Sequence, residues 1–352
     1  MEDVIGSPPR RLRAGVVGLG MMGRNHVRVW DELVGEADLV AVADPDPAAV
    51  ARATTGRRVT GYHEPQEMFE RERLDVVSIV APTSLHLPVT LQALEHGINV
   101  LVEKPIAATR DEATRMIEAA KAAGRMLTVG HIERFNPAIR ELHRRLAAGE
   151  LGRIFQIHAT RLGPFPARIR DVGVVVDLGP HDLDIMRYLV GSEPIRIYAE
   201  TERRIHTEHE DLFNGTMKFA NGVVGVLDIN WLTPTKRRVL TVTGERGMYV
   251  ADYIAQDLVF YANPDASATW INPSDGMSTT SVSEGEMTRR SITREEPLGV
   301  ELREFARAVL TGGPPPVDPH DGMIALLLAR KMVESAVSGE AVSGSTLEEV
   351  LA

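Results

Sequence analysis

The sequence predicts an α/β protein with two domains: a doubly wound parallel sheet, and then an α+β domain with a large open sheet. Apolar strands alternate with helix patterns over about the first 130 residues, which is typical of a parallel sheet with helices on both faces. From residue 154 onward, strand patterns follow one another around hairpin turns instead. We therefore expect a tail at 1–10, a doubly wound domain at 11–130 and a second domain at 131–352, whose sheet is mostly antiparallel with helices on one face.

The first predicted strand leads directly into a glycine-rich turn. The strand at 13–17 is followed by Gly18-Leu19-Gly20-Met21-Met22-Gly23, and a helix pattern begins there. Gly18 permits a tight turn, Gly20 lets the backbone approach a pyrophosphate, and Gly23 lets helix and strand pack closely. The free N–H groups from Met21 onward suit phosphate oxygens. This context predicts a dinucleotide site rather than a glycine-rich turn without a ligand.

An acidic residue follows the second predicted strand, at 38–43. Asp44 stands about 20 residues beyond the third glycine, the place of the residue that binds the adenosine ribose hydroxyls. The neighbouring residues Pro45-Asp46-Pro47 include no arginine for a 2′-phosphate, which favours NAD over NADP. Binding of NADP would require an arginine at 52, 57 or 58 to fold back.

A later strand, at 99–102, ends in Glu103-Lys104-Pro105. Lys104 is expected at the carboxyl edge of the parallel sheet, where open α/β folds bind ligands. The alternative is a solvated lysine in a turn. The rest of the chain decides between the two.

The remaining elements complete the alternation and then the second sheet. The expected helices are 24–33, 64–71, 88–96, 110–123, 137–148, 177–190, 298–310 and 322–338, and the further strands are 75–80, 126–129, 154–161, 216–220, 223–231, 239–243, 247–253, 258–261 and 287–293. An open sheet with helices on one face must cover its other face, and a second subunit is the economical solution.

A second group of polar residues lies in Asp177-Leu178-Gly179-Pro180-His181. Proline is tolerated in a first helical turn, so a helix is expected to begin near Asp177. Asp177, His181 and Asp184 then share one helix face. A carboxylate one turn from an imidazole can orient it as a general base. The alternative is that Asp177 is only an N-cap and His181 a partly buried helix residue. With a single histidine in this group, metal binding is not expected.

Arginines precede that helix. Arg161, Arg168 and Arg170 fall within ten residues of a chain whose net charge is −10. Guanidinium groups suit phosphate oxygens, which predicts a phosphorylated or nucleotide-linked substrate; a solvated surface segment is the alternative. Arg134 and Asn136, at the crossing into the second domain, are further candidates for contact with substrate or cofactor.

Composition excludes several classes. The net charge of −10 argues against nucleic-acid binding, and the chain has no cysteine for thiolate chemistry. No apolar run reaches the length of a membrane span, and residues 1–10 lack the apolar core of a signal peptide. The cytoplasm is therefore the expected location.

These motifs together resemble the glucose–fructose oxidoreductase/inositol dehydrogenase/MocA (Gfo/Idh/MocA) family. The matching segments are 18–23, Ala81-Pro82-Thr83-Ser84-Leu85-His86, Glu103-Lys104-Pro105, Asp177 with His181, Glu304-Phe305 and Asp318-Pro319-His320-Asp321-Gly322. The resemblance implies a Rossmann domain joined to an open sheet that packs between subunits as a homodimer or homotetramer. It also implies a cis Lys104–Pro105 bond in such a turn, and the cofactor-binding residues Gly18, Gly20, Met21, Met22, Gly23, Asp44, Pro82, His86 and Glu103.

The resemblance further implies Lys104, His181 and Asp177 as catalytic residues. In the expected reaction, hydride leaves a sugar carbinol for NAD while His181 accepts the hydroxyl proton and Lys104 orients or polarises that oxygen. Asp177 would hold His181 or bind a neighbouring hydroxyl. Segment 129–137 resembles that of UDP-N-acetylglucosamine 3-dehydrogenases in the family, which favours a UDP-amino sugar oxidised at C3. The alternatives are a free sugar or inositol as substrate, a non-catalytic NAD-binding sensor, and a hydrolase that uses NAD transiently.

Overall fold

The computed structural model describes residues 11–33, 35–166, 172–205, 208–263, 285–344 and 347. The chain forms two compact units. The first contains Met1–Ile132 and Glu296–Leu326, and the second contains Glu133–Glu295 and Leu327–Ala352. The sequence patterns suggested two continuous domains, 11–130 and 131–352, whereas in the structure a late segment of the chain returns to the first unit.

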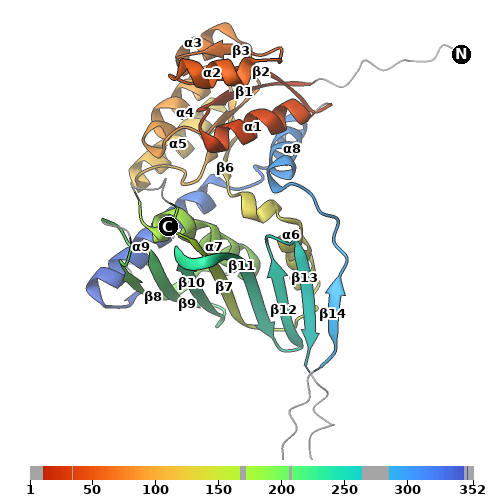
Figure 1. Ribbon diagram of the computed structural model, residues 1–352, viewed down its shortest axis with the longest axis vertical. Coiled ribbons are helices and arrows are strands. Elements are labelled where there is room, and N and C mark those ends of the chain that lie inside the picture. Colours follow the sequence, from red (N-terminus) through yellow and green to blue (C-terminus); the bar gives the residue numbers. More distant parts are fainter. Residues whose placement is uncertain are drawn as a thin grey trace, which may run out of the picture. The chain divides into compact units, whose positions relative to one another are not determined.

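The first unit contains a parallel sheet of six strands in the order β3-β2-β1-β4-β5-β6. Figure 1 labels β1, β2, β3 and β6 of this sheet. The strands are β1 (Leu12–Val17), β2 (Ala37–Ala43), β3 (Thr60–Tyr62), β4 (Val76–Ile79), β5 (Asn99–Glu103) and β6 (Leu127–Gly130). The strand order reverses between β1 and β4, and ligands of doubly wound folds bind beyond the carboxyl ends of the strands at such a point. The predicted doubly wound fold is confirmed.

Helices cover this sheet. They are α1 (Met21–Glu32), α2 (Pro47–Thr54), α3 (Pro65–Arg71), α4 (His86–Glu95), α5 (Arg110–Ala123) and α8 (Pro297–Thr311), with the 3-10 turn η1 (Thr83–Leu85) before α4. The short elements α2 and β3 were not anticipated. Helix α8 belongs to this unit, where it lies beside α1 (Figure 1). Its apolar face packs on α1, and the rings of Trp30 and Phe305 meet edge to face with their centroids 6.5 Å apart.

The second unit contains a sheet of nine strands in the order β14-β13-β12-β11-β7-β10-β9-β8-β15. The strands are β7 (Ile154–Pro164), β8 (Pro194–Glu202), β9 (Leu212–Phe219), β10 (Val224–Asn230), β11 (Leu232–Gly244), β12 (Gly247–Asp252), β13 (Asp257–Ala262), β14 (Met287–Arg290) and β15 (Val342–Ser343). Strands β7 and β10 are parallel and every other pair is antiparallel, as expected for a mostly antiparallel sheet. Both predicted hairpins form, β9–β10 and β11–β12.

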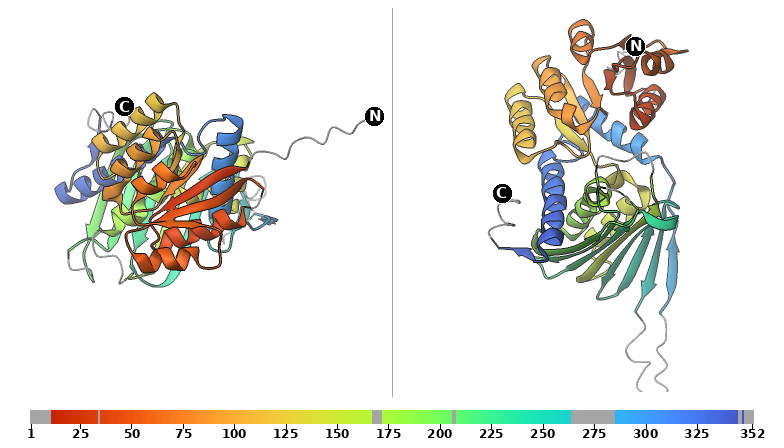
Figure 2. Two further views of the ribbon diagram at one scale, coloured as in Figure 1. Left: turned by 90° about the horizontal axis from the view of Figure 1, so that it is seen from above. Right: turned by 60° about the vertical axis from the view of Figure 1, so that its left-hand side comes forward.

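Helices lie on one face of the nine-stranded sheet (Figure 2). They are α6 (Pro137–Ala147), which follows the 3-10 turn η2 (Ile132–Phe135), α7 (Val174–Val190) and the later part of α9 (Pro319–Ser338). Along β10 the side chains toward the helices are buried, and the alternate ones are only partly buried. Within the described ranges, none of the helices combines the length and the apolar composition of a membrane span.

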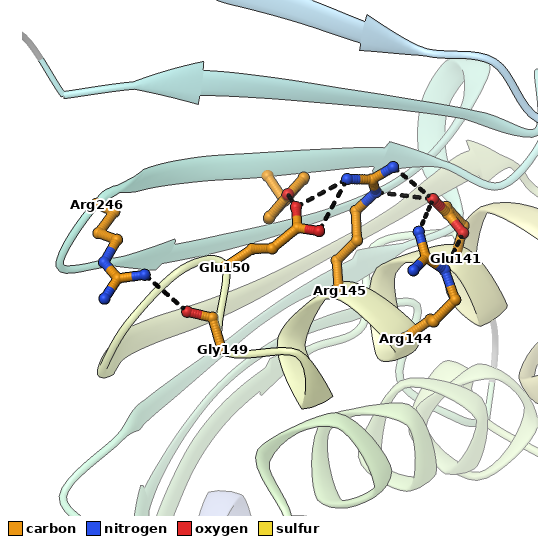
Figure 3. Close-up of polar contacts among 7 residues, drawn as sticks. Glu141, Arg144, Arg145, Gly149, Glu150 and Arg246 are labelled. Atoms are coloured by element: carbon orange, nitrogen blue, oxygen red, sulfur yellow. Dashed lines mark hydrogen bonds and ion pairs between the residues drawn. The ribbon is translucent and has the colours of Figure 1, made fainter.

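A charged network anchors the end of α6 to the sheet (Figure 3). Arg145 donates to Glu141 at 2.7 Å and to Glu150 at 2.8 Å, and the Tyr249 hydroxyl of β12 donates to Glu150 at 2.7 Å. The hydrogen bond from Tyr249, together with Arg145, holds the pKa of Glu150 below its usual range despite some burial. The turn between β11 and β12 is joined to the same place, because Arg246 donates to the Gly149 carbonyl.

Candidate functional site

The glycine turn has the geometry that its sequence predicts. Gly18 has a φ of 89°, and a Cβ there would lie 2.6 Å from the Val80 carbonyl oxygen. A Cβ at Gly23 would lie 1.9 Å from the Gly18 oxygen, so side chains are excluded at both positions. At Gly20, by contrast, no described atom lies within 4 Å of a Cβ. The backbone therefore leaves no room for a side chain at Gly18 or Gly23, whereas the space beside Gly20 is open to a pyrophosphate.

Asp44 is attached to this turn directly. One of its carboxylate oxygens accepts from the Leu19 N–H at 2.6 Å, and the other accepts from the Asp46 N–H at 2.8 Å. Each carboxylate oxygen can accept a second hydrogen bond, so capacity remains for ribose hydroxyls. Asp44 therefore also stabilises the conformation of the glycine turn, a role that the sequence motif alone did not indicate.

The surroundings of Asp44 fit NAD. Helix α1 begins at Met21 with Gly20 as its N-cap, and no side chain caps its first N–H groups. Two of the three arginines considered for a 2′-phosphate have acidic partners: Arg57 binds Asp31 at 2.8 Å, and Arg52 lies 3.6 Å from Asp46. Gly18, Gly20, Gly23 and Asp44, with the helix start at Met21 and Met22, would hold the dinucleotide.

At the end of β5, Glu103 organises the chain next to Lys104. Glu103 accepts from His26 Nε2 and from the backbone N–H of Lys104, both at 3.1 Å. Burial alone would raise the pKa of Glu103, but the hydrogen bond and charge of His26 and the charge of Lys104 outweigh it and lower that pKa. The Lys104–Pro105 bond is cis, as predicted. Glu103 is therefore an ionised anchor for the lysine backbone.

His86 connects the two loops of this edge. Its Nε2 lies 2.9 Å from the Ala81 carbonyl oxygen, and its Nδ1 lies 2.9 Å from that of Pro105. The side chain is 1% exposed, and burial lowers its pKa although the carbonyl contacts oppose that shift. This placement gives His86 a structural contact between the loops after β4 and β5, while Pro82 is exposed. The sequence-based expectation was that both residues line the nicotinamide pocket.

In the second unit, α7 begins earlier than predicted. The helix starts at Val174 rather than near Asp177, and Pro180 lies in its interior. The start is fixed by Glu210, whose carbonyl accepts from the Val174 N–H at 2.9 Å and whose carboxylate accepts from the Val175 N–H at 3.2 Å. The prediction from Pro180 was wrong because the helix start is held by Glu210, which is distant in sequence, and Pro180 is accommodated in the helix interior.

This start changes the interpretation of Asp177. It is a first-turn residue and not the N-cap, which is Gly173. Asp177 and His181 remain one helical turn apart, and both are partly exposed. Asp184, on the same face, is buried and accepts two bonds from Arg134, at 2.8 and 2.5 Å.

Arg161 is buried in a cluster of charges. Its side chain is 2% exposed and binds Asp182 at 2.6 and 3.0 Å and Glu133 at 2.9 Å. Burial disfavours its charge, but the two carboxylates outweigh that effect and raise its pKa. Because its guanidinium is occupied by these partners, the structure favours a structural role over the phosphate contact expected from sequence.

Arg134 and Asn136 also have partners within the second unit. Besides Asp184, the Arg134 guanidinium lies 4.8 Å from the Tyr188 ring centroid. Asn136 is the N-cap of α6, accepting from the Ala138 N–H at 3.1 Å and donating to the Tyr253 carbonyl at 3.0 Å. Arg168 and Arg170 lie outside the described residues. Within the described part of the chain, no three His, Asp or Glu side chains are grouped to hold a metal ion.

Some polar residues around these sites were not identified from sequence. Glu133 and Asp182 hold Arg161, and Arg238 of β11 lies 3.7 Å from Glu133. In the first unit, Glu301 of α8 is 1% exposed and the charge of Glu103 acts on it. Its position on the apolar face of α8, between Leu298 and Phe305, was the signal that could have identified it.

Comparison with known proteins defines the class. Residues 12–131 match the model of the oxidoreductase family with an NAD-binding Rossmann fold, and residues 139–250 match the GFO/IDH/MocA C-terminal domain. The chain belongs to the Gfo/Idh/MocA oxidoreductase family, as the motifs indicated. It is an NAD-dependent sugar or polyol oxidoreductase acting on CH–OH groups.

Individual relatives include enzymes for different substrates. The chain is 38% identical over 228 residues to inositol 2-dehydrogenase 4 of Saccharopolyspora erythraea, covering 62% of this chain and 67% of that protein. It is 28% identical over 303 residues to the UDP-N-acetylglucosamine 3-dehydrogenase of Acidithiobacillus ferrooxidans, covering 86% of this chain and 90% of that protein. The solved structure of the latter enzyme superposes with a TM-score of 0.81 and 26% identity, covering 94% of this chain and 98% of that one. Levoglucosan dehydrogenase in complex with NADH has the same fold, with a TM-score of 0.80 and 22% identity over 95% of this chain and 99% of that one.

Proposed function

We propose that this chain oxidises a nucleotide sugar, with UDP-N-acetylglucosamine oxidised at C3 as the leading candidate. The observation that carries the proposal is the match along nearly the whole chain, 94%, to the solved UDP-N-acetylglucosamine 3-dehydrogenase. The identity to inositol 2-dehydrogenase 4 is higher, but that match covers 62% of the chain. A myo-inositol 2-dehydrogenase of Thermotoga maritima matches 97% of the chain at 26% identity, against 28% for the nucleotide-sugar enzyme, and this keeps an inositol as the second candidate. The match to the nucleotide-sugar enzyme includes most of the second unit, which we propose as the substrate-binding part.

The proposed chemistry separates hydride from proton. When bound, NAD supplies the acceptor for the hydride of the carbinol carbon. We propose that His181 accepts the hydroxyl proton and that Lys104 orients and polarises the same oxygen. Asp177, one turn before His181, would hold the imidazole or bind a neighbouring hydroxyl of the substrate. Glu103 supports Lys104 through the backbone N–H that it binds at 3.1 Å.

The substrate is tested by turnover across a panel. Purified protein with NAD is given UDP-N-acetylglucosamine, UDP-glucose, N-acetylglucosamine, glucose, myo-inositol and scyllo-inositol, and NADH formation is followed by absorbance. We expect the highest kcat/KM for UDP-N-acetylglucosamine and a product oxidised at C3 by NMR. A preference for an inositol would replace the proposal by the second candidate, which the relative at 38% identity favours.

Lys104 is tested by the Lys104→Met variant. Removing the ammonium group should lower kcat by about 10²-fold or more, the usual contribution of a positioned proton-transfer group, while NADH still binds. The measurement is kcat on the preferred substrate beside an NADH titration by fluorescence. Near-normal turnover with intact cofactor binding would refute the assigned role. Two outcomes with the wild-type protein would favour the other functions. Binding of NADH without turnover of any substrate would favour a non-catalytic sensor, and conversion of a glycoside without net formation of NADH would indicate a hydrolase that uses NAD transiently.

A further inference from the structure

A buried acid of the first unit has no assigned role in the reaction. Glu301, in α8, is 1% exposed, and neither carboxyl oxygen has a hydrogen-bond partner among the described residues. An unpaired buried charge is very costly, so such a group is stable only in its protonated form. Burial first, and then the charge of Glu103, raise the pKa of Glu301 well above its usual value. Burial and the lack of a partner therefore both favour the neutral, protonated form of Glu301.

The neighbouring carboxyl has the opposite state. Glu103 is ionised, and both of its oxygens are engaged, one by His26 and one by the Lys104 backbone N–H. It packs on Gly130 of β6 so closely that a Cβ there would lie 3.0 Å from its carboxyl carbon. The carboxylate is thus fixed from several sides. Glu301 reaches this part of the unit on α8, because the next residue, Leu302, shares one core cluster with Leu101 of β5 and Trp30 of α1.

Several titratable groups belong to α1, to the ends of β5 and β6, and to α8 itself. Helix α1 provides His26, the end of β5 provides Glu103 and Lys104, and His131 is buried directly after β6. On α8 itself, Arg303 and Glu304 are close in sequence to Glu301. Of these groups, Glu103 acts on Glu301 directly, while His26 and Lys104 act on Glu103.

We propose that Glu301 is a positioning residue for Lys104. In its neutral form it lets the Glu103 carboxylate remain between His26 and the Lys104 N–H. Loss of the Glu301 proton at alkaline pH places a second negative charge near the first. Two nearby carboxylates repel each other strongly. Glu103 then loses the arrangement that holds the Lys104 backbone, and turnover falls. The predicted effect on turnover rests on the proposed role of Lys104. The predicted protonation of Glu301 does not depend on that role.

The first experiment needs no substrate. Thermal and urea unfolding of wild type and Glu301→Gln are compared between pH 5 and pH 9. A carboxyl whose folded pKa is raised stabilises the fold below its unfolded pKa, and this stability is lost as pH rises toward the folded pKa. The wild-type unfolding constant should therefore increase relative to that of Glu301→Gln by about tenfold per pH unit. Parallel stability curves would overturn the inference. Glu301→Met gives the same test if the glutamine variant does not fold.

The second experiment measures the alkaline limb of kcat/KM. In wild type we expect a reversible fall above neutral pH, displaced by about one pH unit or more to higher pH in Glu301→Gln, which cannot ionise. Glu118→Gln, the same substitution at an exposed position of α5, is the control and should keep the wild-type profile. A flat wild-type profile up to pH 10, or the same limb in both proteins, would overturn the positioning role.

A third measurement covers the case in which no substrate is found. Amine-directed labelling of Lys104, mapped by mass spectrometry, should proceed at different rates in wild type and Glu301→Gln at pH 9 to 10, because only in wild type does a second carboxylate displace Glu103 from the Lys104 backbone. Equal rates would overturn the positioning role. Failure of the substrate panel leaves this measurement and the stability comparison valid, so the two proposals fail separately.

Discussion

Arg161 is a residue whose burial changes the role that its sequence pattern suggests. In the sequence it is one of three nearby arginines in an acidic chain, which indicates phosphate binding. In the structure its guanidinium N–H groups donate to the carboxylates of Asp182 and Glu133, and all three side chains are at most 10% exposed. The two carboxylates on either side of an apolar residue, Asp182 and Asp184, each bind an arginine from another element.

The variant Arg161→Met tests this reading. It leaves Asp182 and Glu133 buried without their cation, and breaking a buried pair in this way costs about 3–5 kcal/mol. The free energy of unfolding from urea titration measures the loss. The matched control is Arg153→Met, whose side chain is 79% exposed, and we expect little change there. Unchanged stability with a raised substrate KM would instead support the phosphate contact.

Helix α7 is the element on which the second half of the proposed chemistry depends. Its first residues are held by Glu210, and Gly173 makes the contact possible because a Cβ there would lie 2.0 Å from the Glu210 carboxylate. The orientation of Asp177 and His181 therefore depends on a glycine outside the helix.

We expect Gly173→Ala to displace the Glu210 cap. Loss of a helix cap costs about 0.5–2 kcal/mol, and the altered helix start should lower kcat more than it changes NADH affinity. Gly179→Ala is the control within the same helix, because a Cβ there finds only contacts of 3.7 Å or more. That change should be neutral or slightly stabilising by urea unfolding. Equal stability of the two variants would show that Glu210 does not cap the helix.

At the scale of the whole molecule, the nine-stranded sheet leaves one face without a helix among the described residues (Figure 2). The register aligns one row of side chains across this face. The row is Thr216, Val226, His158, Thr241, Val250 and Val259. This mixture of valine and threonine with one histidine carries few charges, which supports the prediction of a homodimer or homotetramer through the sheet.

A charge in the centre of this row tests the prediction. Val226→Glu should reduce the assembly to smaller species, because a carboxylate buried between two sheets has no partner. Sedimentation velocity of wild type and variant gives the masses. Val337→Glu is the same substitution at a side chain that is 84% exposed on α9, and it should not change the mass. A monomeric wild type would refute assembly through this face.

The sequence by itself determined the fold class of both units, the glycine turn, the position of Asp44 and the strand that leads into Lys104. These features follow from local patterns: strand and helix periodicity, turn residues, and the sterics of glycine near a backbone oxygen. The family motifs were also contiguous. The start of α7 could not be predicted from the local sequence, because it depends on Glu210, more than thirty residues later.

Only the tertiary structure decided which polar side chains are occupied by structural contacts and which remain available to bind substrate or cofactor. Arg161, Arg134 and His86 have partners that are distant in the chain, and burial makes those contacts structural. The pKa of Glu301 is raised by burial in an apolar environment and by the charge of Glu103, nearly 200 residues earlier. Sequence patterns report local conformation, whereas charge state and availability depend on solvent access and on partners that folding brings together.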